Sequence, residues 1–314
     1  MKFVKKHFLK NLILVTGTHT SGKSMVSPVV ASLSKVEMLR KIYYLDQISI
    51  LYNFKKINSE ISKFLGQHIL DLSYYEQLIG RNLNFRIEDE TSIFQSKDSK
   101  LFKKRIYSKK KGEKVLKRHE KMNTHMLLDA HDGIWFYKFW KNLKIKNLKI
   151  INIHRNPIDI VNSWINSDLG VAERQTLCQI PLISINNKIK PFYLFDNFSK
   201  NNLKNKTEII IDMIDECVRQ EIRAFKMVKN KKNILRINFD EFANKTDDNI
   251  KKICSFLGLN RTSFTKKIMK KENLPRIINE FDRELKLKKI KNKVNKNKLK
   301  KLENLVVFYN RNNK

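Results

Sequence analysis

The feature that most constrains this chain is a glycine-bearing loop at residues 17–24, which reads Gly-Thr-His-Thr-Ser-Gly-Lys-Ser and fits the pattern GxxxxGK[ST]. It follows the apolar run 12–15, typical of a buried parallel strand, and precedes apolar residues at helical spacing from Met25 to Leu33. Small residues let successive backbone N–H groups point at one anion, and the helix N-terminus adds positive potential. The motif therefore predicts a phosphate-binding loop, with Lys23 as its point charge.

The alternation of strand, turn and helix continues along the chain. Strands are expected at 114–117, 148–153 and 234–237, and helices at 122–142, 158–165, 207–228 and 247–257. Residues 34–110 read as mostly helical, and the aromatic-rich stretch 168–206 reads as a binding loop or lid. Strands that alternate with helices predict an α/β fold, in which a parallel sheet is flanked by helices on both faces.

The second site-bearing segment is Arg155 to Trp164, which follows the best-formed strand after the loop. A protein that hydrolyses ATP or GTP would end such a strand in an acidic residue that holds magnesium. The strand at 148–153 is followed by Arg155 instead, which favours a second anionic group over a metal. Ser163 lies eight residues later on the next helix, so that both side chains could reach one phosphate.

These segments resemble the sulfotransferase family, whose members take the sulfuryl group from phosphoadenosine phosphosulfate (PAPS) and share the fold of phosphate-loop nucleotide binders. The family's Arg-(Asn/His)-Pro segment with its Ser-Trp or Ser-Tyr pair is matched by Arg155, Ser163 and Trp164. The late segments 234–242 and 253–259 are also similar, so that the resemblance spans 12–260. The loop departs from the family twice, because Thr20 stands where a cation is usual and Lys23 where threonine is usual.

The resemblance implies a role for each matched position. The phosphosulfate would be held by the loop residues Gly17, Thr20, Ser21, Gly22, Lys23 and Ser24, and the 3′-phosphate by Arg155 and Ser163. A late basic loop over the 3′-phosphate would come from Lys270, Lys271 or Arg276.

Sulfuryl transfer also needs a base for the acceptor proton, and the chemistry requires no metal. Lys117-Arg118-His119 is similar to the Lys-Thr-His of cytosolic sulfotransferases, which makes His119 the expected base, with Lys117 and Lys23 as catalytic cations. Glu120 is the next candidate, followed by His125 or His131. We expect His19 to shape the loop and His154 to be structural.

Composition limits the class of protein without naming its partner. The chain has 65 Lys and Arg against 31 Asp and Glu, a formal charge of +34, while 41% hydrophobic residues argue against a disordered basic polypeptide. Three widely spaced cysteines support neither a disulfide framework nor a zinc cluster, and they fit a reduced, cytoplasmic compartment. No apolar run is long enough to predict a transmembrane helix.

The expected protein is a PAPS-dependent, metal-independent sulfotransferase with a domain at 1–282 and a basic, helical C-terminal segment at 283–314. Its acceptor would be a hydroxyl-bearing carbohydrate or lipid-linked molecule, and its charge could bring it to the anionic inner face of a membrane. Two alternatives stay open: an ATP-dependent kinase, because of Lys23-Ser24, and a nucleic-acid or anionic-membrane binding protein, because of the charge. No specific nucleic acid is expected, since no helix-turn-helix, RNA-recognition or zinc motif is present.

Overall fold

The centre of the protein is a parallel β-sheet with the strand order β2-β3-β1-β4-β7. The computed structural model describes residues 3, 7–169, 180–185, 187–195 and 205–313. The strands are β1 (Asn11–Gly17), β2 (Val36–Lys41), β3 (His125–His131), β4 (Asn147–His154) and β7 (Ile234–Asn238). The four pairings between these strands are all parallel. The carboxyl ends of the strands therefore lie at one edge of the sheet, which we call the carboxyl edge, and their amino ends lie at the other, the amino edge. This confirms the expected α/β fold.

Helices cover both faces of the sheet because β1 is apolar on both. Side chains of a strand alternate between faces, and Leu12 and Leu14 pack against α3 (Ser59–Ile79) and α6 (Tyr137–Asn142). Ile13 and Val15 face the other way, toward α1 (Lys23–Ala31) and α11 (Thr246–Leu257). The apolar run at 12–15 therefore reflects a strand that is buried on both of its faces.

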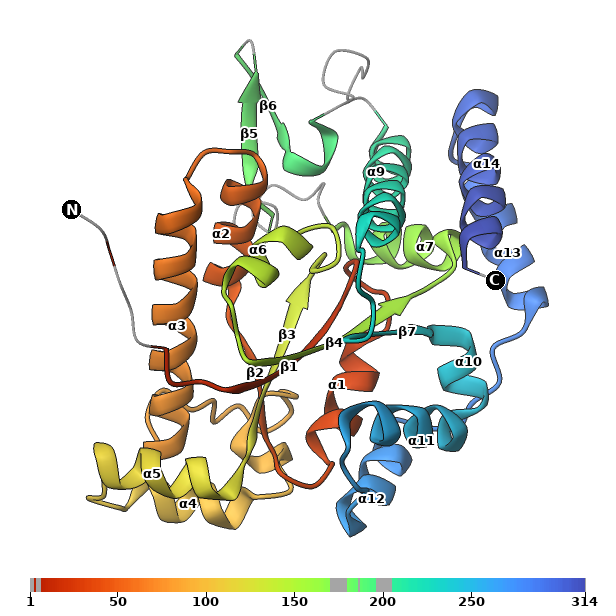
Figure 1. Ribbon diagram of the computed structural model, residues 1–314. Coiled ribbons are helices and arrows are strands. Elements are labelled where there is room, and N and C mark those ends of the chain that lie inside the picture. The colour runs from red at the N-terminus through yellow and green to blue at the C-terminus, as the bar shows by residue number, and fades with distance from the viewer. Residues whose placement is uncertain (1–2, 4–6, 170–179, 186, 196–204, 314) are drawn as a thin grey trace.

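The remaining elements occupy the two edges and the flanks of the sheet (Figure 1). The helices α4 (Ser99–Ile106) and α5 (Glu113–Met122) lie at the amino edge, and a hairpin of β5 (Leu182–Ile185) and β6 (Lys188–Pro191) lies beyond the carboxyl edge. The other helices are α2 (Tyr43–Asn53), α7 (Pro157–Ser167), α9 (Lys206–Met227), α10 (Phe239–Asn244), α12 (Ser263–Lys271), α13 (Glu280–Lys291) and α14 (Lys296–Asn312).

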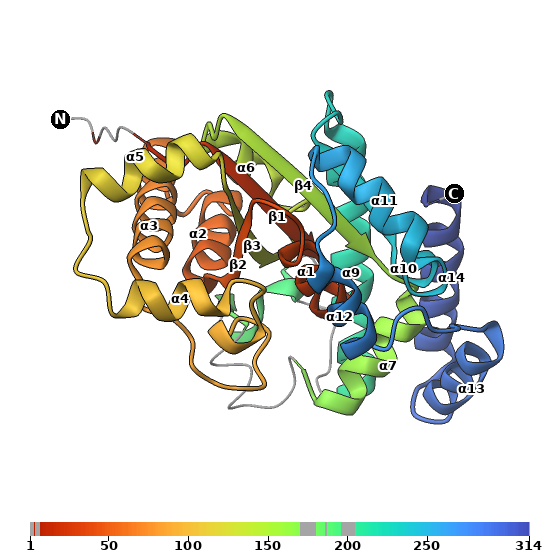
Figure 2. The ribbon, with the colours of Figure 1, turned by 90° about the horizontal axis from the view of Figure 1, so that it is seen from below.

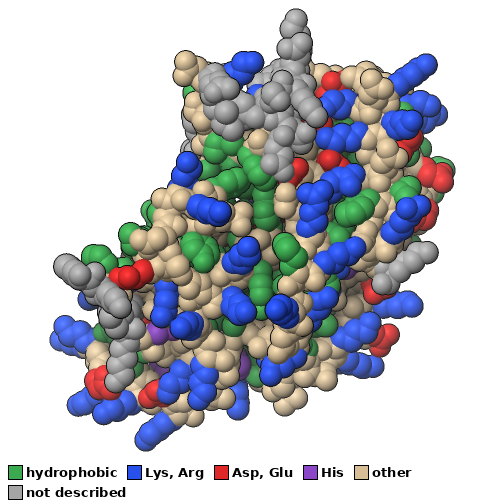
Figure 3. Space-filling model, turned by 45° about the horizontal axis from the view of Figure 1, so that its top comes forward, with side chains coloured by type: hydrophobic (Ala, Val, Ile, Leu, Met, Phe, Trp, Pro, Cys, Tyr) green, Lys and Arg blue, Asp and Glu red, His purple; other side chains and the backbone are tan. Residues whose placement is uncertain are grey.

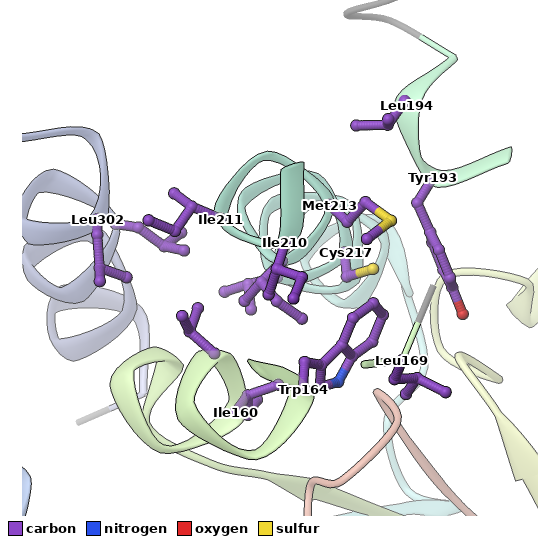
Figure 4. Close-up of a cluster of buried hydrophobic side chains, with 14 of the residues drawn as sticks. Ile160, Trp164, Leu169, Tyr193, Leu194, Ile210, Ile211, Met213, Cys217 and Leu302 are labelled. Atoms are coloured by element: carbon purple, nitrogen blue, oxygen red, sulfur yellow. The ribbon is translucent and has the colours of Figure 1, made fainter. Parts of the chain in front are cut away.

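The lysine-rich C-terminal segment is helical and packs onto the same body as the sheet. Leu302 and Leu305 of α14 are buried in a cluster with residues of α7 and α9. In that cluster Trp164 points from α7 toward Met213 and Cys217 of α9 (Figure 4). The boundary expected after residue 282 falls inside α13, and α14 contributes to the core beside α9.

Two local predictions were wrong, and both concern residues between 113 and 142. Residues 114–117 belong to helix α5 rather than to a strand, and 122–142 contains strand β3, with α-helix only from Tyr137 to Asn142. Strand β2 lies in the stretch that was expected to be mostly helical. Short apolar runs fit a buried strand and a buried helix equally well, so periodicity alone does not separate them. The stretch 168–206 lies partly outside the described residues.

No helix among the described residues combines the length and the apolar character that crossing a membrane would require.

Candidate active site

The loop at 17–24 connects β1 to α1 at the carboxyl edge of the sheet, and two of its positions admit only glycine. Gly17 has a φ of 148°, and a Cβ added there would lie 2.1 Å from the carbonyl oxygen of Ile153. Gly22 has a φ of 105°, and its Cβ would lie 2.0 Å from Cδ2 of Phe239. The backbone of the loop is thus held close to β4 and to the start of α10.

Lys23 is buried and its ammonium group lies within the loop. Its Nζ donates to the carbonyl oxygens of Gly17 (2.9 Å) and Thr18 (3.1 Å). Burial lowers the pKa of Lys23, and the carboxylates of Asp129 and Asp132 oppose this shift. The hydroxyl of Ser21 is buried with no hydrogen-bond partner in the structure, while Ser24 is exposed at the first turn of α1.

A second cationic group lies beside the loop at the end of β4. The Nη1 atom of Arg155 donates to the carbonyl oxygen of Thr20 (3.1 Å), and its guanidinium stacks over Phe239 at 4.7 Å from the ring centroid. Arg276 approaches the same ring at 5.7 Å. Two guanidinium groups therefore contact the same ring, next to the N-terminus of α1.

A hydrogen bond from Trp164 connects helix α7 to the loop. Its Nε1 atom donates to the carbonyl oxygen of His19 at 3.2 Å, and the indole is fully buried. Ser163 is the neighbour of Trp164 on this helix, and its hydroxyl donates to the carbonyl oxygen of Asp159 at 2.8 Å. The Arg155–Trp164 segment and the loop are therefore one structural unit.

His131, the last residue of β3, lies across the loop from α7. Its ring stacks on that of His19, with centroids 3.5 Å apart and planes 7° from parallel. Its Nδ1 lies 3.1 Å from Oδ2 of Asp46 on α2, and its backbone N–H donates to Oδ1 of the same carboxyl. Burial lowers the pKa of His131 well below its usual value, helped by Lys23 and Lys41, so the ring is neutral at neutral pH.

A hollow opens in front of these rings between α2 and the residues after β6. Its walls include Tyr43, Asp46, His131 and Phe192, and Tyr193 closes one side by donating to Oδ2 of Asp132 at 2.9 Å. Burial raises the pKa of Asp46 to about 7, and it does the same for Asp132. A neutral base, a lysine in an anion loop and an aromatic hollow thus share one edge of the sheet.

Comparison with known proteins identifies the family to which this arrangement belongs. The family model described as "Sulfotransferase domain" matches residues 12–306. The chain belongs to the sulfotransferase family. No curated protein matches it.

Solved structures of other sulfotransferases are similar to this one at low identity. The sulfotransferase domain from the curacin biosynthetic pathway is 9% identical with a TM-score of 0.45, over 82% of this chain and 77% of that one. The sulfotransferase domain of the Synechococcus PCC 7002 olefin synthase is 11% identical with a TM-score of 0.44, over 84% and 78%. Sulfotransferase STF9 from Mycobacterium avium is 11% identical with a TM-score of 0.40, over 84% and 67%.

The base expected for this sulfotransferase, His119, lies at the wrong edge of the sheet. It sits on α5, where its Nδ1 is 3.6 Å from Oε1 of Glu37 and 3.5 Å from Oγ1 of Thr124, just before β3 begins. Strand β3 separates it from His131 by about 20 Å, at about 3.3 Å per residue. Lys117 and Glu120 are exposed on the same helix and pair with Glu113 and Lys10. None of the three can reach the loop, so their predicted catalytic roles were wrong.

Three features of this sulfotransferase site were missed. Asp46 carries no sequence signal, and the matched segment 234–242 does not mark Phe239 as a contact of the loop, because each gains its role from residues far away in the chain. Asp129 did carry one, since it follows the apolar run Met126-Leu127-Leu128. Its Oδ2 accepts from Ser27 at 3.0 Å, and its buried Oδ1 has no hydrogen-bond partner in the structure. Strand β3, which pairs with β1, thus carries a carboxylate. The expectation that no acidic residue lies beside the loop rested only on the strand before Arg155.

Some of the other predicted residues lie at the loop, and others lie away from it. The loop residues, Arg155, Ser163 and Arg276 come together at the carboxyl edge, and their contact with a ligand stays a prediction. Lys271 instead donates to Gln95 at 2.6 Å, and Lys270 is exposed at the end of α12. Within the described ranges, no group of three or more His, Cys, Asp or Glu side chains could hold a metal ion.

Proposed function

We propose that this sulfotransferase moves a sulfuryl group from PAPS to a hydroxyl of an acceptor bound in the hollow beside His131. The observation that carries the proposal is the pairing of two anion-binding features at one edge of the sheet. The loop at 17–24 provides converging backbone N–H groups and Lys23, and Arg155 lies one hydrogen bond away from it at Thr20. PAPS has two separate anionic groups: its phosphosulfate would bind to the loop, and its 3′-phosphate would bind to Arg155.

The donor's 3′-phosphate would lie at Arg155, with Ser163 and Arg276 as further donors. Arg155 has a buried Nε with no hydrogen-bond partner in the structure, which leaves part of its guanidinium available. Arg276 adds positive charge at the same ring, Phe239. Guanidinium groups suit a phosphate because their planar array of N–H donors matches two of its oxygens.

His131 would act as the base in place of the expected His119. In the transfer, the acceptor hydroxyl oxygen forms a bond to sulfur while the bond from sulfur to the bridging phosphate oxygen breaks, and Nε2 of His131 takes the hydroxyl proton. Adenosine 3′,5′-bisphosphate leaves with the electron pair of the broken bond. Lys23 would balance the negative charge that develops on this leaving group.

The hollow has a volume of about 30 Å³, so it would admit the reacting hydroxyl and the part of the acceptor next to it rather than a whole acceptor. Tyr43 and Phe192 present aromatic rings, and Gln47 and Asp46 present polar groups at the mouth. This combination suits a carbohydrate or a lipid-linked hydroxyl compound, because sugar rings pack on aromatic faces while their hydroxyls hydrogen-bond at the edges.

A binding titration tests the donor assignment. Calorimetry of the full chain with adenosine 3′,5′-bisphosphate in the presence of EDTA should show tight binding, and Arg155→Ala should weaken it about 10- to 100-fold, the range of a charge-assisted contact. The control Arg223→Ala removes an exposed arginine of α9 and should bind as the wild type does.

Asp129 gives the kinase alternative a specific observation, because its carboxylate lies near the carboxyl end of β3, the strand next to β1, where magnesium-dependent phosphate-loop enzymes place one. The same titration with ATP and magnesium separates the two functions. Equal or tighter binding of magnesium ATP, or unchanged binding of the bisphosphate by Arg155→Ala, would contradict the sulfotransfer proposal.

A further inference from the structure

A second cavity lies at the amino edge of the sheet, away from the candidate active site. It is enclosed by the end of α3, by α4 and by α5, which lie together at one end of the molecule (Figure 2). Its volume of about 390 Å³ falls within the range of about 300–1,000 Å³ typical of small-molecule sites. The proposed transfer chemistry makes no use of this cavity.

The floor of this cavity is apolar. Leu78 and Ile79 come from the last turn of α3, Leu101 from α4, and Val115 and Met122 from α5. Val115 and Met122 are seven residues apart, so they lie on one face of α5 and line the same wall. A ligand that fills the space would gain free energy from burying an apolar body.

The rim of the cavity is cationic. Lys110 and Lys111 precede α5, and Lys114 and Arg118 lie one helical turn apart on it. All four are exposed, and within the described residues no ion pair joins any of them to a carboxylate. Four uncompensated positive charges around one opening attract a negatively charged group.

The charged side chains deeper in the wall of the cavity form an ion pair with each other. Arg105 donates from Nη1 and Nη2 to the two carboxylate oxygens of Glu37, at 2.8 and 3.0 Å. The two acidic residues of α5, Glu113 and Glu120, pair with Lys117 and Lys10. A ligand's charge therefore belongs at the rim and its apolar part belongs inside.

We propose that this cavity binds an anionic amphiphile with one apolar chain, held by a phosphate or carboxylate head at Lys114 and Arg118. The chain lies against Leu101 and Val115. This site is independent of the proposed sulfuryl transfer.

Calorimetry with decyl phosphate, used below the concentration at which it forms micelles, tests the proposal on the full chain. Decyl phosphate should bind with an affinity that falls as salt is added, because screening weakens the contacts at the exposed rim. Inorganic phosphate and decanol each carry half of the proposed recognition, and each should bind at least about tenfold more weakly.

Two variants separate the rim from the floor. Lys114→Gln/Arg118→Gln removes two rim charges and should weaken decyl phosphate at least about tenfold. Val115→Phe places a bulky ring where the chain is proposed to lie and keeps every charge, and it should weaken decyl phosphate at least about tenfold. The control Lys288→Gln/Lys289→Gln removes two exposed charges from α13 and should bind as the wild type does.

Three results would overturn the proposal. Equal binding of inorganic phosphate and decyl phosphate would reduce the site to a basic surface. Unchanged binding by Val115→Phe, in a variant whose circular dichroism matches the wild type, would place the ligand outside the cavity. Binding to phosphatidylglycerol vesicles without binding to monomeric decyl phosphate would make the region a membrane-docking surface instead.

Discussion

The chemistry of His131 depends on which of its nitrogens carries the proton. Nδ1 faces Oδ2 of Asp46, so an ionised Asp46 accepts a hydrogen bond from Nδ1–H, which keeps the proton on Nδ1 and leaves the lone pair of Nε2 free to act as a base. Burial raises the pKa of Asp46 to about 7, which places this ionisation near neutral pH. In the proposed mechanism the two residues would work as a unit, in which Asp46 would position the ring and His131 would touch the acceptor.

His131→Ala should lower turnover about 10²- to 10⁴-fold, the usual contribution of a general base, while adenosine 3′,5′-bisphosphate binding stays within about twofold of the wild type. The measurement is sulfuryl transfer with any accepted hydroxyl compound, alongside calorimetry. His119→Ala is the matched comparison, and it should retain turnover. A loss of turnover in a folded His119→Ala protein, with His131→Ala still active, would contradict the assignment of the base.

At the scale of elements, α13 joins the segments that carry the second anion site. Arg283 on α13 reaches both Asp159 of α7 and Asp240 of α10, with Nε–Oδ2 and Nη2–Oδ2 distances of 3.0 and 2.6 Å. Lys286 adds a second contact to Asp159 at 2.5 Å. Since Asp159 is 1% exposed, its charge depends on these partners for compensation.

Arg283→Ala should therefore lower the free energy of unfolding by about 3–5 kcal/mol, because it leaves buried carboxylates short of a partner. Urea unfolding followed by circular dichroism measures the change. Lys288→Ala on the same helix, whose side chain is exposed, should stay within about 0.5 kcal/mol of the wild type. Equal stability of the two variants would show that α13 does not compensate these charges.

At the scale of the whole molecule, the positive charge is spread rather than gathered. Figure 3 shows Lys and Arg side chains distributed across the described part of one face, with Asp and Glu mostly toward one side. Only a few cations, such as Lys23 and Arg155, lie at the candidate active site. Some acidic groups, in contrast, are buried and hold their proton more tightly than they do in water. Asp132 is 2% exposed, and burial raises its pKa to about 7 from a usual 3.8.

This raised pKa predicts how stability depends on pH. Between about pH 4 and pH 7 the folded protein holds a proton on Asp132 that the unfolded chain has lost, so the free energy of unfolding falls as pH rises through this window. The contribution is at most about 1.4 kcal/mol per pH unit. Urea midpoints at pH 5 and 7.5 should show a larger fall for the wild type than for Asp132→Asn. An equal fall in both would mean that Asp132 does not hold the proton.

What the sequence determined by itself is the loop, the strand before it and the Arg155–Trp164 segment. Each is local, because backbone conformation at a glycine, a strand end or a helix start depends on neighbours within about ten residues. What only the tertiary structure decided is the pairing of His131 with Asp46, the position of His119 at the amino edge of the sheet, and the partners of Arg155. His131 and Asp46 are 85 residues apart, and one segment assigned as strand instead of helix was enough to place His119 at the wrong edge. Local patterns do not encode such distances, since they arise only when strands from different parts of the chain pair in one sheet.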